Sequence, residues 1–286
     1  MTRDLHQDAP VRISVVVPLW NEEAYIVRCL EALLAQTVPP FEILLVDNMS
    51  TDRTVERALS VPAGSVPVRV LRQQDRQGLV PTRDAGFAAA GGDVVARIDG
   101  DTIVDGDWIE QLTACFASGR VAAATGPVGY YDVVCGSVLN RVDGWGRRLV
   151  FALGRRQPFL FGANMALRRS AWERIAGEVC ADIDDRFHED IDLAIHLTRC
   201  DLVIEFAPAV TASISARRLN STAAAFDDYL LRFDRTFAAH GVTHAPIRSA
   251  ASVLRAAFPL LRLAHLRAAE PRFVPSHRPE APPAHP

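Results

Sequence analysis

The sequence predicts an α/β fold in which helices cover both faces of a mostly parallel β-sheet. Between residues 12 and 128, short apolar runs of strand length alternate with amphipathic stretches of helix length. This alternation is typical of successive strand–helix–strand units. Several runs are apolar at every position, as in strands that are buried on both faces. We therefore expect the ligand site at the carboxyl ends of the strands.

The first half of the chain supplies these elements in regular order. A buried strand at residues 13–18 precedes a helix expected from Asn21, which ends before Pro39 and Pro40. Its apolar face has the spacing i, i+3, i+4, i+7 and i+8 and consists of Ile26, Cys29, Leu30, Leu33 and Leu34. Further strands are expected at 41–47, 68–72, 94–98 and 121–128, and further helices at 52–60, 79–90 and from about residue 107.

The second half is less regular and ends in helices. Residues 129–157 are rich in glycine and arginine, and we assign no element there. We expect a strand at 159–167, helices at 170–175 and 188–199, two short strands up to residue 214, a helix at 222–240 and a helix at 247–267 that Pro259 interrupts. The chain then divides into a flexible start (1–10), an α/β domain (11–218), C-terminal helices (219–270) and a disordered proline-rich tail (271–286).

Composition excludes several classes of protein. The 286 residues include 31 basic and 34 acidic ones, and the formal net charge of −3 argues against a protein that coats nucleic acid. Every basic residue is arginine, so Schiff-base chemistry and a lysine-dependent phosphate loop are excluded. Five widely spaced cysteines predict buried thiols in a reducing compartment. Without a signal-peptide pattern or an apolar run of about 18 residues, we expect a cytoplasmic chain.

Polar residues gather where the first two strands end. Asn21, Glu22 and Glu23 follow Pro18 and suit the positively polarised start of a helix, so capping alone accounts for them. Asp47 ends the second strand, where its carboxylate can accept a hydrogen bond from a nucleobase or a ribose, or organise the turn.

Asp99 and Asp101 follow the fourth strand and are separated by Gly100. Two carboxylates leaving a buried strand offer the hard oxygen ligands that Mg²⁺ or Mn²⁺ prefers. An EF-hand fails because Ile103 and Val104 stand where that loop needs an oxygen ligand and a glycine. A plain turn remains an alternative.

Glu189 and Asp190 open the helix at 188–199, either to suit the helix dipole or to act as a base. Successive helix residues point about 100° apart, so at most one of them can face a reacting atom. For His188 beside them, a solvent-facing or capping role is favoured over metal binding. Together with the strand-end carboxylates, this pair indicates a cleft that holds a divalent cation against a phosphate-rich ligand.

Six segments in a fixed order, across about residues 11–215, strengthen this interpretation. They are Ser14 to Pro18 with Asn21-Glu22-Glu23, Val46 to Thr54, Gly78 to Gly86, Asp99-Gly100-Asp101, Gly162 to Ala166, and Glu189-Asp190. In this order and spacing the chain resembles the glycosyltransferase family 2 enzymes of GT-A fold.

The resemblance implies an inverting transferase that moves a sugar from a nucleotide-diphospho-sugar, with UDP as the family default, to a hydroxyl or phosphate of a glycan or lipid-linked acceptor. Residues 11–218 would be the GT-A catalytic domain, Mg²⁺ or Mn²⁺ the cofactor, and nucleic acid no partner. The implied donor contacts are Pro18, Asn21, Glu22, Asp47, Arg83, Asp99 and Asn164. Asp101, with Asp99, would hold the metal, and Asp190 would be the catalytic base with Glu189 beside it.

The chain departs from the family pattern at two places. Asp84 replaces the asparagine that usually follows the arginine, and no Gln-x-x-Arg-Trp motif follows Asp190. Arg217 and Arg218 follow a strand instead, which argues against a processive polysaccharide synthase. Two alternatives stay open: a non-catalytic nucleotide-sugar-binding module, and a sugar-nucleotide pyrophosphorylase, although the glycine-rich, lysine-dependent opening of the latter is absent.

The C-terminal segment is basic. No acidic residue occurs between Arg235 and Ala269, while Arg248, Arg255 and Arg262 recur every seven residues on one face of a helix. Residues 247–268 are therefore a candidate for peripheral contact with the inner face of the cell membrane. The favoured alternative is a helix packed on the core with its arginines in solvent.

Overall fold

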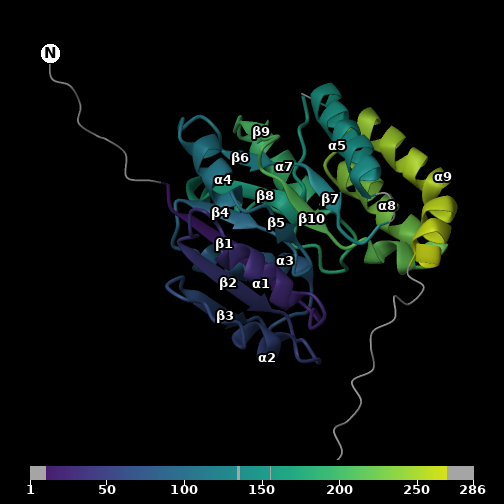
Figure 1. Cartoon of the computed structure of the whole chain (residues 1–286). Coiled ribbons are helices and arrows are strands. Elements are labelled where there is room, and N and C mark those ends of the chain that lie inside the picture. The colour runs from purple at the N-terminus through teal and green to yellow at the C-terminus, as the bar shows by residue number, and fades with distance from the viewer. Residues whose placement is uncertain (1–10, 134–135, 155, 269–286) are drawn as a thin grey trace, which may run out of the picture.

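A computed structural model of the chain describes residues 11–133, 136–154 and 156–268. A seven-stranded sheet, in the order β3-β2-β1-β4-β8-β6-β9, lies at its centre with helices around it (Figure 1), and a three-stranded sheet has the order β5-β10-β7. The strands are β1 (Ile13–Leu19), β2 (Glu42–Asp47), β3 (Val68–Arg72), β4 (Val94–Arg97), β5 (Ile103–Val104), β6 (Ala123–Thr125), β7 (Val128–Tyr130), β8 (Met165–Arg168), β9 (Ile204–Phe206) and β10 (Ala212–Ile214).

The large sheet is mostly parallel, as predicted. β1 pairs in parallel with β2 on one side and β4 on the other, and β3 extends the parallel set beyond β2. Only β8 runs in the opposite direction, between β4 and β6, among the described strands of this sheet. The carboxyl ends of β1, β2 and β4 therefore meet at one edge. Asp47 is the last residue of β2, and Asp99 follows β4 by two residues.

Helices cover both faces of this sheet, and a buried apolar cluster lies on each face. One cluster joins β1 and β2 to α1, α2 and α4, and the other joins the opposite side of these strands to α3, α6 and α7. The α-helices are α1 (Ile26–Leu34), α2 (Thr54–Leu59), α3 (Leu79–Ala89), α4 (Trp108–Phe116), α5 (Gly136–Leu153), α6 (Arg169–Ile175), α7 (Glu189–Arg199), α8 (Ala223–Ala239) and α9 (Ala245–Ala268).

The first helix begins at Ile26 and not at Asn21, so the capping interpretation of Asn21 was wrong. Asn21 has a φ of +56°, and its side-chain oxygen accepts from the Thr51 amide at 2.8 Å. The Glu22 amide donates to Thr54 Oγ1 at 2.7 Å. These groups are engaged by the loop after β2 and by the first residue of α2, and these contacts hold the segment outside helix α1.

Several further elements also differ from the prediction. The expected strand at 121–128 is two strands, because the chain leaves the large sheet at Gly126, where a Cβ would lie 1.8 Å from the Val210 carbonyl oxygen. The expected strand at 159–167 is a 3-10 turn, Gly162–Asn164, followed by β8. Residues left unassigned form α5. Pro259 lies inside an uninterrupted α9.

The helices α8 and α9 pack on each other at one side of the molecule, with α5 beside them (Figure 1). Phe258 of α9 stacks on Phe226 of α8 with ring centroids 4.1 Å apart. Arg255 pairs with Asp227 at 2.5 Å, and Arg248 pairs with Asp234 at 3.0 Å. Among the described residues, no helix combines the length and apolarity needed to cross a bilayer. The predicted tails, 1–10 and 271–286, and Cys135 lie outside the described residues.

Candidate active site

The acidic residues predicted at the ends of β1, β2 and β4 lie at the carboxyl edge of these strands. Glu22 and Asp101 are bridged there by the guanidinium group of Arg217, from the 3-10 turn after β10 (Arg217–Asn220). Arg217 donates to the two oxygens of Glu22 at 2.6 and 2.7 Å, and its Nε lies 3.0 Å from Oδ2 of Asp101. Arg217 lies 195 positions after Glu22 in the sequence, so this group of ion pairs joins distant segments of the chain.

Asp101 lies in a strongly acidic environment. Burial and the neighbouring Asp99 carboxylate raise the pKa of Asp101 to about 7, although Arg217 opposes the shift. Burial also raises the pKa of Glu22. A cation placed beside Asp99 and Asp101 would relieve this concentration of negative charge. Arg217 lies 3.0 Å from Oδ2 of Asp101. The carboxylates of Asp99 and Asp101 are hard oxygen ligands and fit Mg²⁺ or Mn²⁺.

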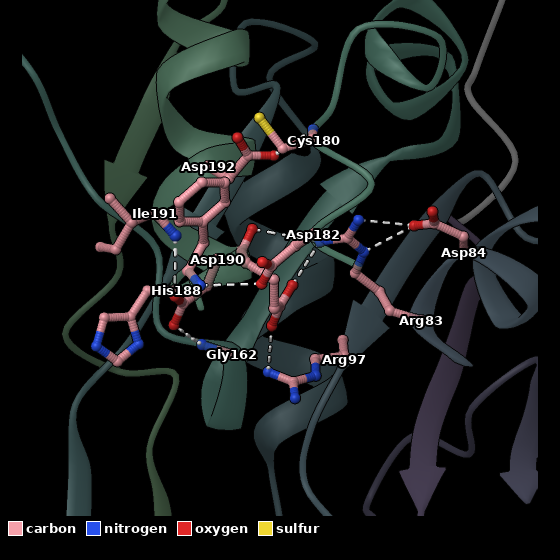
Figure 2. A network of polar contacts seen from close by, with 12 residues as sticks. Arg83, Asp84, Arg97, Gly162, Cys180, Asp182, His188, Asp190, Ile191 and Asp192 are labelled. Atoms are coloured by element: carbon pink, nitrogen blue, oxygen red, sulfur yellow. Dashed lines mark hydrogen bonds and ion pairs between the residues drawn. The ribbon is translucent and has the colours of Figure 1, made fainter. Parts of the chain in front are cut away.

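A buried arginine, Arg97, links this edge to helix α7, and Figure 2 shows its side chain near Gly162 and the start of that helix. Arg97, the last residue of β4, contacts Asp99 Oδ1 at 2.6 Å and Glu189 Oε1 at 3.1 Å. Glu189 also receives Arg83 Nη1 at 2.6 Å. Arg83 is fully buried, and its Nη2 lies 2.7 Å from Asp84 Oδ1. The departure from the family pattern at Asp84 therefore provides a partner for Arg83.

Asp190 is separated from these ion pairs. It is partly exposed, and its Oδ2 accepts from the Gly162 amide at 2.7 Å, while Oδ1 accepts from the Ile191 amide at 2.9 Å. Burial and the charge of Glu189 raise the pKa of Asp190 to about 7, although the Gly162 hydrogen bond favours the ionised form. The first two acidic residues of α7 thus differ: Glu189 lies between two guanidinium groups, and Asp190 keeps access to solvent.

The remaining predicted residues hold the loops of this edge. Asp47 Oδ1 accepts from the Ser50 amide at 3.3 Å, and Pro18 is buried in β1 beside it. The side chain of Asn48 bridges to the loop before α3, accepting from the Gly78 amide at 2.7 Å. Asn21 is exposed, and its contacts are those described above.

Asn164 is fully buried and its amide group is engaged by protein atoms. Its Oδ1 accepts from Trp108 Nε1 at 2.9 Å, and its Nδ2 donates to the carbonyl oxygens of Pro127 and Val210 at 2.9 and 2.8 Å. These contacts tie the turn before β8 to α4 and to the crossing between the two sheets. Asn164 therefore positions the backbone of the 162–164 turn.

His188 stands at the N-cap position of α7, but its side chain is buried and does not cap the helix, contrary to the favoured expectation. Its Nε2 lies 3.1 Å from the Tyr229 carbonyl oxygen, and its ring packs on Phe233 at 3.9 Å between centroids. Burial lowers its pKa to about 3, so the ring is neutral. The helix N-cap at His188 has no side-chain hydrogen bond.

Sequence reasoning missed two residues of this site, Arg97 and Arg217. Arg97 is a charged residue inside an otherwise apolar strand and is 2% exposed, which was the available signal for a buried ion pair. Arg217 follows a short strand of the second sheet, and the sequence carries no signal of what that sheet lies beside. In the sequence, Arg217 stands out only as a departure from the family pattern.

This carboxylate edge on a mixed α/β sheet flanked by helices defines a GT-A-type protein. The family model described as "Glycosyl transferase family 2" matches residues 14–176, so the chain belongs to that family. Glycosyltransferase GlyG of Streptococcus pneumoniae is 39% identical over 100 residues, which are 35% of this chain and 33% of that relative. The match thus spans about a third of the relative's length.

Two solved structures share the fold. The mannosyltransferase PcManGT from Pyrobaculum calidifontis, in complex with GDP-Man and Mn²⁺, has a TM-score of 0.63 at 19% identity, over 91% of this chain and 74% of that one. Glucosyl-3-phosphoglycerate synthase from Mycobacterium tuberculosis, in complex with Mn²⁺, UDP and glucosyl-3-phosphoglycerate, has a TM-score of 0.56 at 20% identity, over 82% of each chain. At these identities the likeness shows the fold alone.

Proposed function

We propose that the chain is a metal-dependent, inverting glycosyltransferase that takes a sugar from a nucleotide-diphospho-sugar. The observation that carries the proposal is the Arg97 bridge. One buried guanidinium group joins Asp99, beside the metal carboxylate Asp101, to Glu189, beside the candidate base Asp190. The donor end and the acceptor end of the reaction are thereby held at a fixed separation by a single side chain.

The donor would lie along the carboxyl edge of β1 and β2. Pro18, Asn21, Glu22 and Asp47 would contact the nucleoside, and Asp99 and Asp101 would hold Mg²⁺ or Mn²⁺ at the diphosphate. When bound, the cation neutralises charge on the departing diphosphate. Arg217 adds a second positive charge beside Asp101, 3.0 Å from its Oδ2. UDP-sugars are our first choice of donor, and GDP- and TDP-sugars the alternatives.

Asp190 would take the proton of the acceptor hydroxyl as its oxygen attacks the anomeric carbon. The bond to the diphosphate breaks on the opposite side, which inverts the configuration. The Gly162 amide fixes Asp190 at 2.7 Å, and a pKa of about 7 makes it an effective base near neutral pH. Glu189, Arg83 and Asn164, whose polar groups are engaged by the protein, would position these residues.

For the acceptor we propose a hydroxyl or phosphate of a glycan or of a lipid-linked intermediate of the cell envelope. Residues 247–268 would then bring the cleft to a membrane surface. The arginines that suggested this contact are partly committed, because Arg248 and Arg255 pair with acidic residues of α8. Val253, Leu260 and Leu263 of α9 are exposed and would supply the contact.

Metal-dependent release of nucleoside diphosphate from nucleotide-sugars tests the proposal. We expect Asp101→Asn and Asp190→Asn each to lower the rate by roughly 10²–10⁴-fold, with Asp184→Asn, an exposed aspartate before α7, as the matched control. At saturating metal, the rate should rise with pH through about 7, because Asp190 must be ionised to accept a proton.

Other outcomes identify the alternatives. Wild-type rates in both Asn variants would refute the assigned roles. Binding of nucleotide-sugar without any turnover would indicate a non-catalytic module. Formation of nucleoside triphosphate when pyrophosphate is added would indicate a pyrophosphorylase.

A further inference from the structure

A second group of ligand-type side chains lies further along α7, one to two turns beyond Glu189 and its ion pairs. It consists of Cys180 from the loop after α6, Asp192 and His196 from α7, and His240 at the end of α8, and one donor atom of each lies within 4.8 Å of all the others. Figure 2 shows Cys180 and Asp192 together, away from Arg97. None of the four has a role in the proposed transfer.

Two of the separations between the donor atoms already match those around one small cation. Cys180 Sγ lies 3.7 Å from His240 Nε2, and His196 Nε2 lies 3.6 Å from Asp192 Oδ1. Tetrahedral zinc with ligand bonds near 2.0–2.3 Å places its donors about 3.3–3.6 Å apart. The 2.6 Å contact between His240 Nε2 and Asp192 Oδ1 would lengthen by less than about 1 Å to admit the ion.

His196 supplies an independent indication of a missing ligand. Its side chain is 9% exposed, and its Nε2 is buried without a hydrogen-bond partner among the described residues. Such an orphaned buried acceptor or donor is costly and rare in folded proteins. The atom faces Asp192 of its own helix and lies within the cluster, where a metal ion would satisfy it.

We propose that Cys180, Asp192, His196 and His240 bind one zinc ion that clips the loop after α6, helix α7 and helix α8 together. Sulfur and imidazole ligands select zinc over the oxygen-seeking Mg²⁺ and Mn²⁺. A thiolate and a carboxylate balance the two positive charges, and the two neutral imidazoles complete four-coordination. Because α7 carries Glu189 and Asp190 at its start, the clip would fix the helix that presents them.

A second contact, between Arg199 and His240, must also change when the ion binds. Arg199 Nη1 lies 3.1 Å from His240 Nδ1, so in the metal-free arrangement the ring proton resides on Nε2 and points at Asp192. When His240 binds the metal through Nε2, its ring proton moves to Nδ1. The guanidinium group of Arg199 must then move away from Nδ1, because both atoms would be donors. Arg199 is exposed and also donates to the His240 carbonyl oxygen at 2.8 Å, so it can turn without losing every partner.

Metal content and cobalt spectroscopy of the full chain test this site. The protein is purified without a polyhistidine tag, and zinc is measured after gel filtration and then exchanged for Co²⁺. We expect about one zinc per chain with sub-micromolar affinity, not displaced by millimolar Mn²⁺. The Co²⁺ form should show a thiolate-to-cobalt charge-transfer band and the intense visible bands of tetrahedral coordination.

Variants assign the ligands. Cys180→Ser should abolish the charge-transfer band, and His196→Gln should lower zinc affinity at least tenfold, while Cys115→Ser, a thiol on α4 outside the cluster, should behave like the wild type. The proposal is overturned if the wild-type chain binds no zinc or cobalt, or if the charge-transfer band survives in Cys180→Ser. The wild-type titration decides the matter even if a variant fails to fold. Loss of transfer activity with normal zinc binding would count against the proposed function and not against this site.

Discussion

Gly162 determines how closely the Arg97 guanidinium group approaches the backbone beside Asp190. A Cβ at this position would lie 1.6 Å from Arg97 Nη1 and 3.0 Å from Glu189 Oε1. The same residue donates its amide hydrogen to Asp190. Only glycine at position 162 leaves room for Arg97 while its amide also holds Asp190. Gly162 thus keeps the ion pairs of Arg97 close to the candidate base.

Gly162→Ala should consequently damage both stability and transfer. Displacing Arg97 in a packed interior is expected to cost roughly 1–3 kcal/mol in the free energy of unfolding. The rate should fall more than the donor affinity, since the disturbed residues lie on the base side of the site. Denaturant melts and steady-state kinetics measure the two effects.

The matched control for Gly162→Ala is Gly106→Ala, where a Cβ meets nothing within 4 Å. The control should change stability by less than about 0.5 kcal/mol. Equal behaviour of the two variants would show that the close approach of Arg97 is not required.

At the residue scale, the sequence could predict the acidic half of the site but not the basic half. Asp47, Asp99 and Asp101 follow apolar runs, and that position alone places them at the edge of a parallel sheet. Their partners Arg97 and Arg217 depend on contacts between distant segments. Periodicity within a window of residues carries no information on such contacts.

At the scale of elements, prediction from the sequence also fails where local helix and strand preferences compete with packing between distant segments. Helix α5 was not predicted because Gly144 and Gly146 lower helix propensity. A Cβ at either position would meet nothing within 4 Å, so close packing does not require these glycines. Helix α9 continues through Pro259 because Phe258 is 3% exposed and stacks on Phe226, which offsets the lost hydrogen bond. Elements with a strong apolar period, such as α1, were predicted correctly apart from their ends.

The exposed face of α9 gives a prediction about membranes. Leu260 and Leu263 are 73% and 47% exposed, whereas Arg248 and Arg255 are paired with α8. Binding to anionic vesicles should therefore depend more on apolar insertion than on these charges. We expect Leu260→Asp with Leu263→Asp to remove co-sedimentation with vesicles, and added salt to weaken it only modestly.

Leu59→Asp is the control for this vesicle experiment, because Leu59 is 65% exposed on α2 and lies outside the C-terminal helices. If the wild type does not sediment with the vesicles, or if the α9 variant sediments as the wild type does, the membrane contact proposed for residues 247–268 is wrong.

At the scale of the whole molecule, the net charge of −3 conceals two regions. Removing the five arginines of residues 235–269 from the count leaves 26 basic against 34 acidic residues, or −8, in the rest of the chain. The structure lets these regions interact, since Arg235, Arg248 and Arg255 each pair with an aspartate of α8. The acidic remainder includes the carboxylates that gather at Asp101, where a bound cation and Arg217 would balance the charge.

Because that site joins segments from Pro18 to Arg217, donor binding should stabilise the whole α/β unit. A ligand that binds only the folded state adds RT ln(1 + [L]/Kd), about 2.7 kcal/mol at a concentration of 100 Kd. We expect one class among UDP-, GDP- and TDP-sugars to raise the melting temperature in the presence of Mn²⁺, and the increase to be largely lost in Asp101→Asn. Omitting Mn²⁺ is the appropriate negative control, since a chelator would also strip the zinc proposed at Cys180. If no nucleotide-sugar shifts the melting temperature at millimolar concentration with Mn²⁺, the carboxyl edge of β1 and β2 is not a nucleotide site, and the proposed function falls with it.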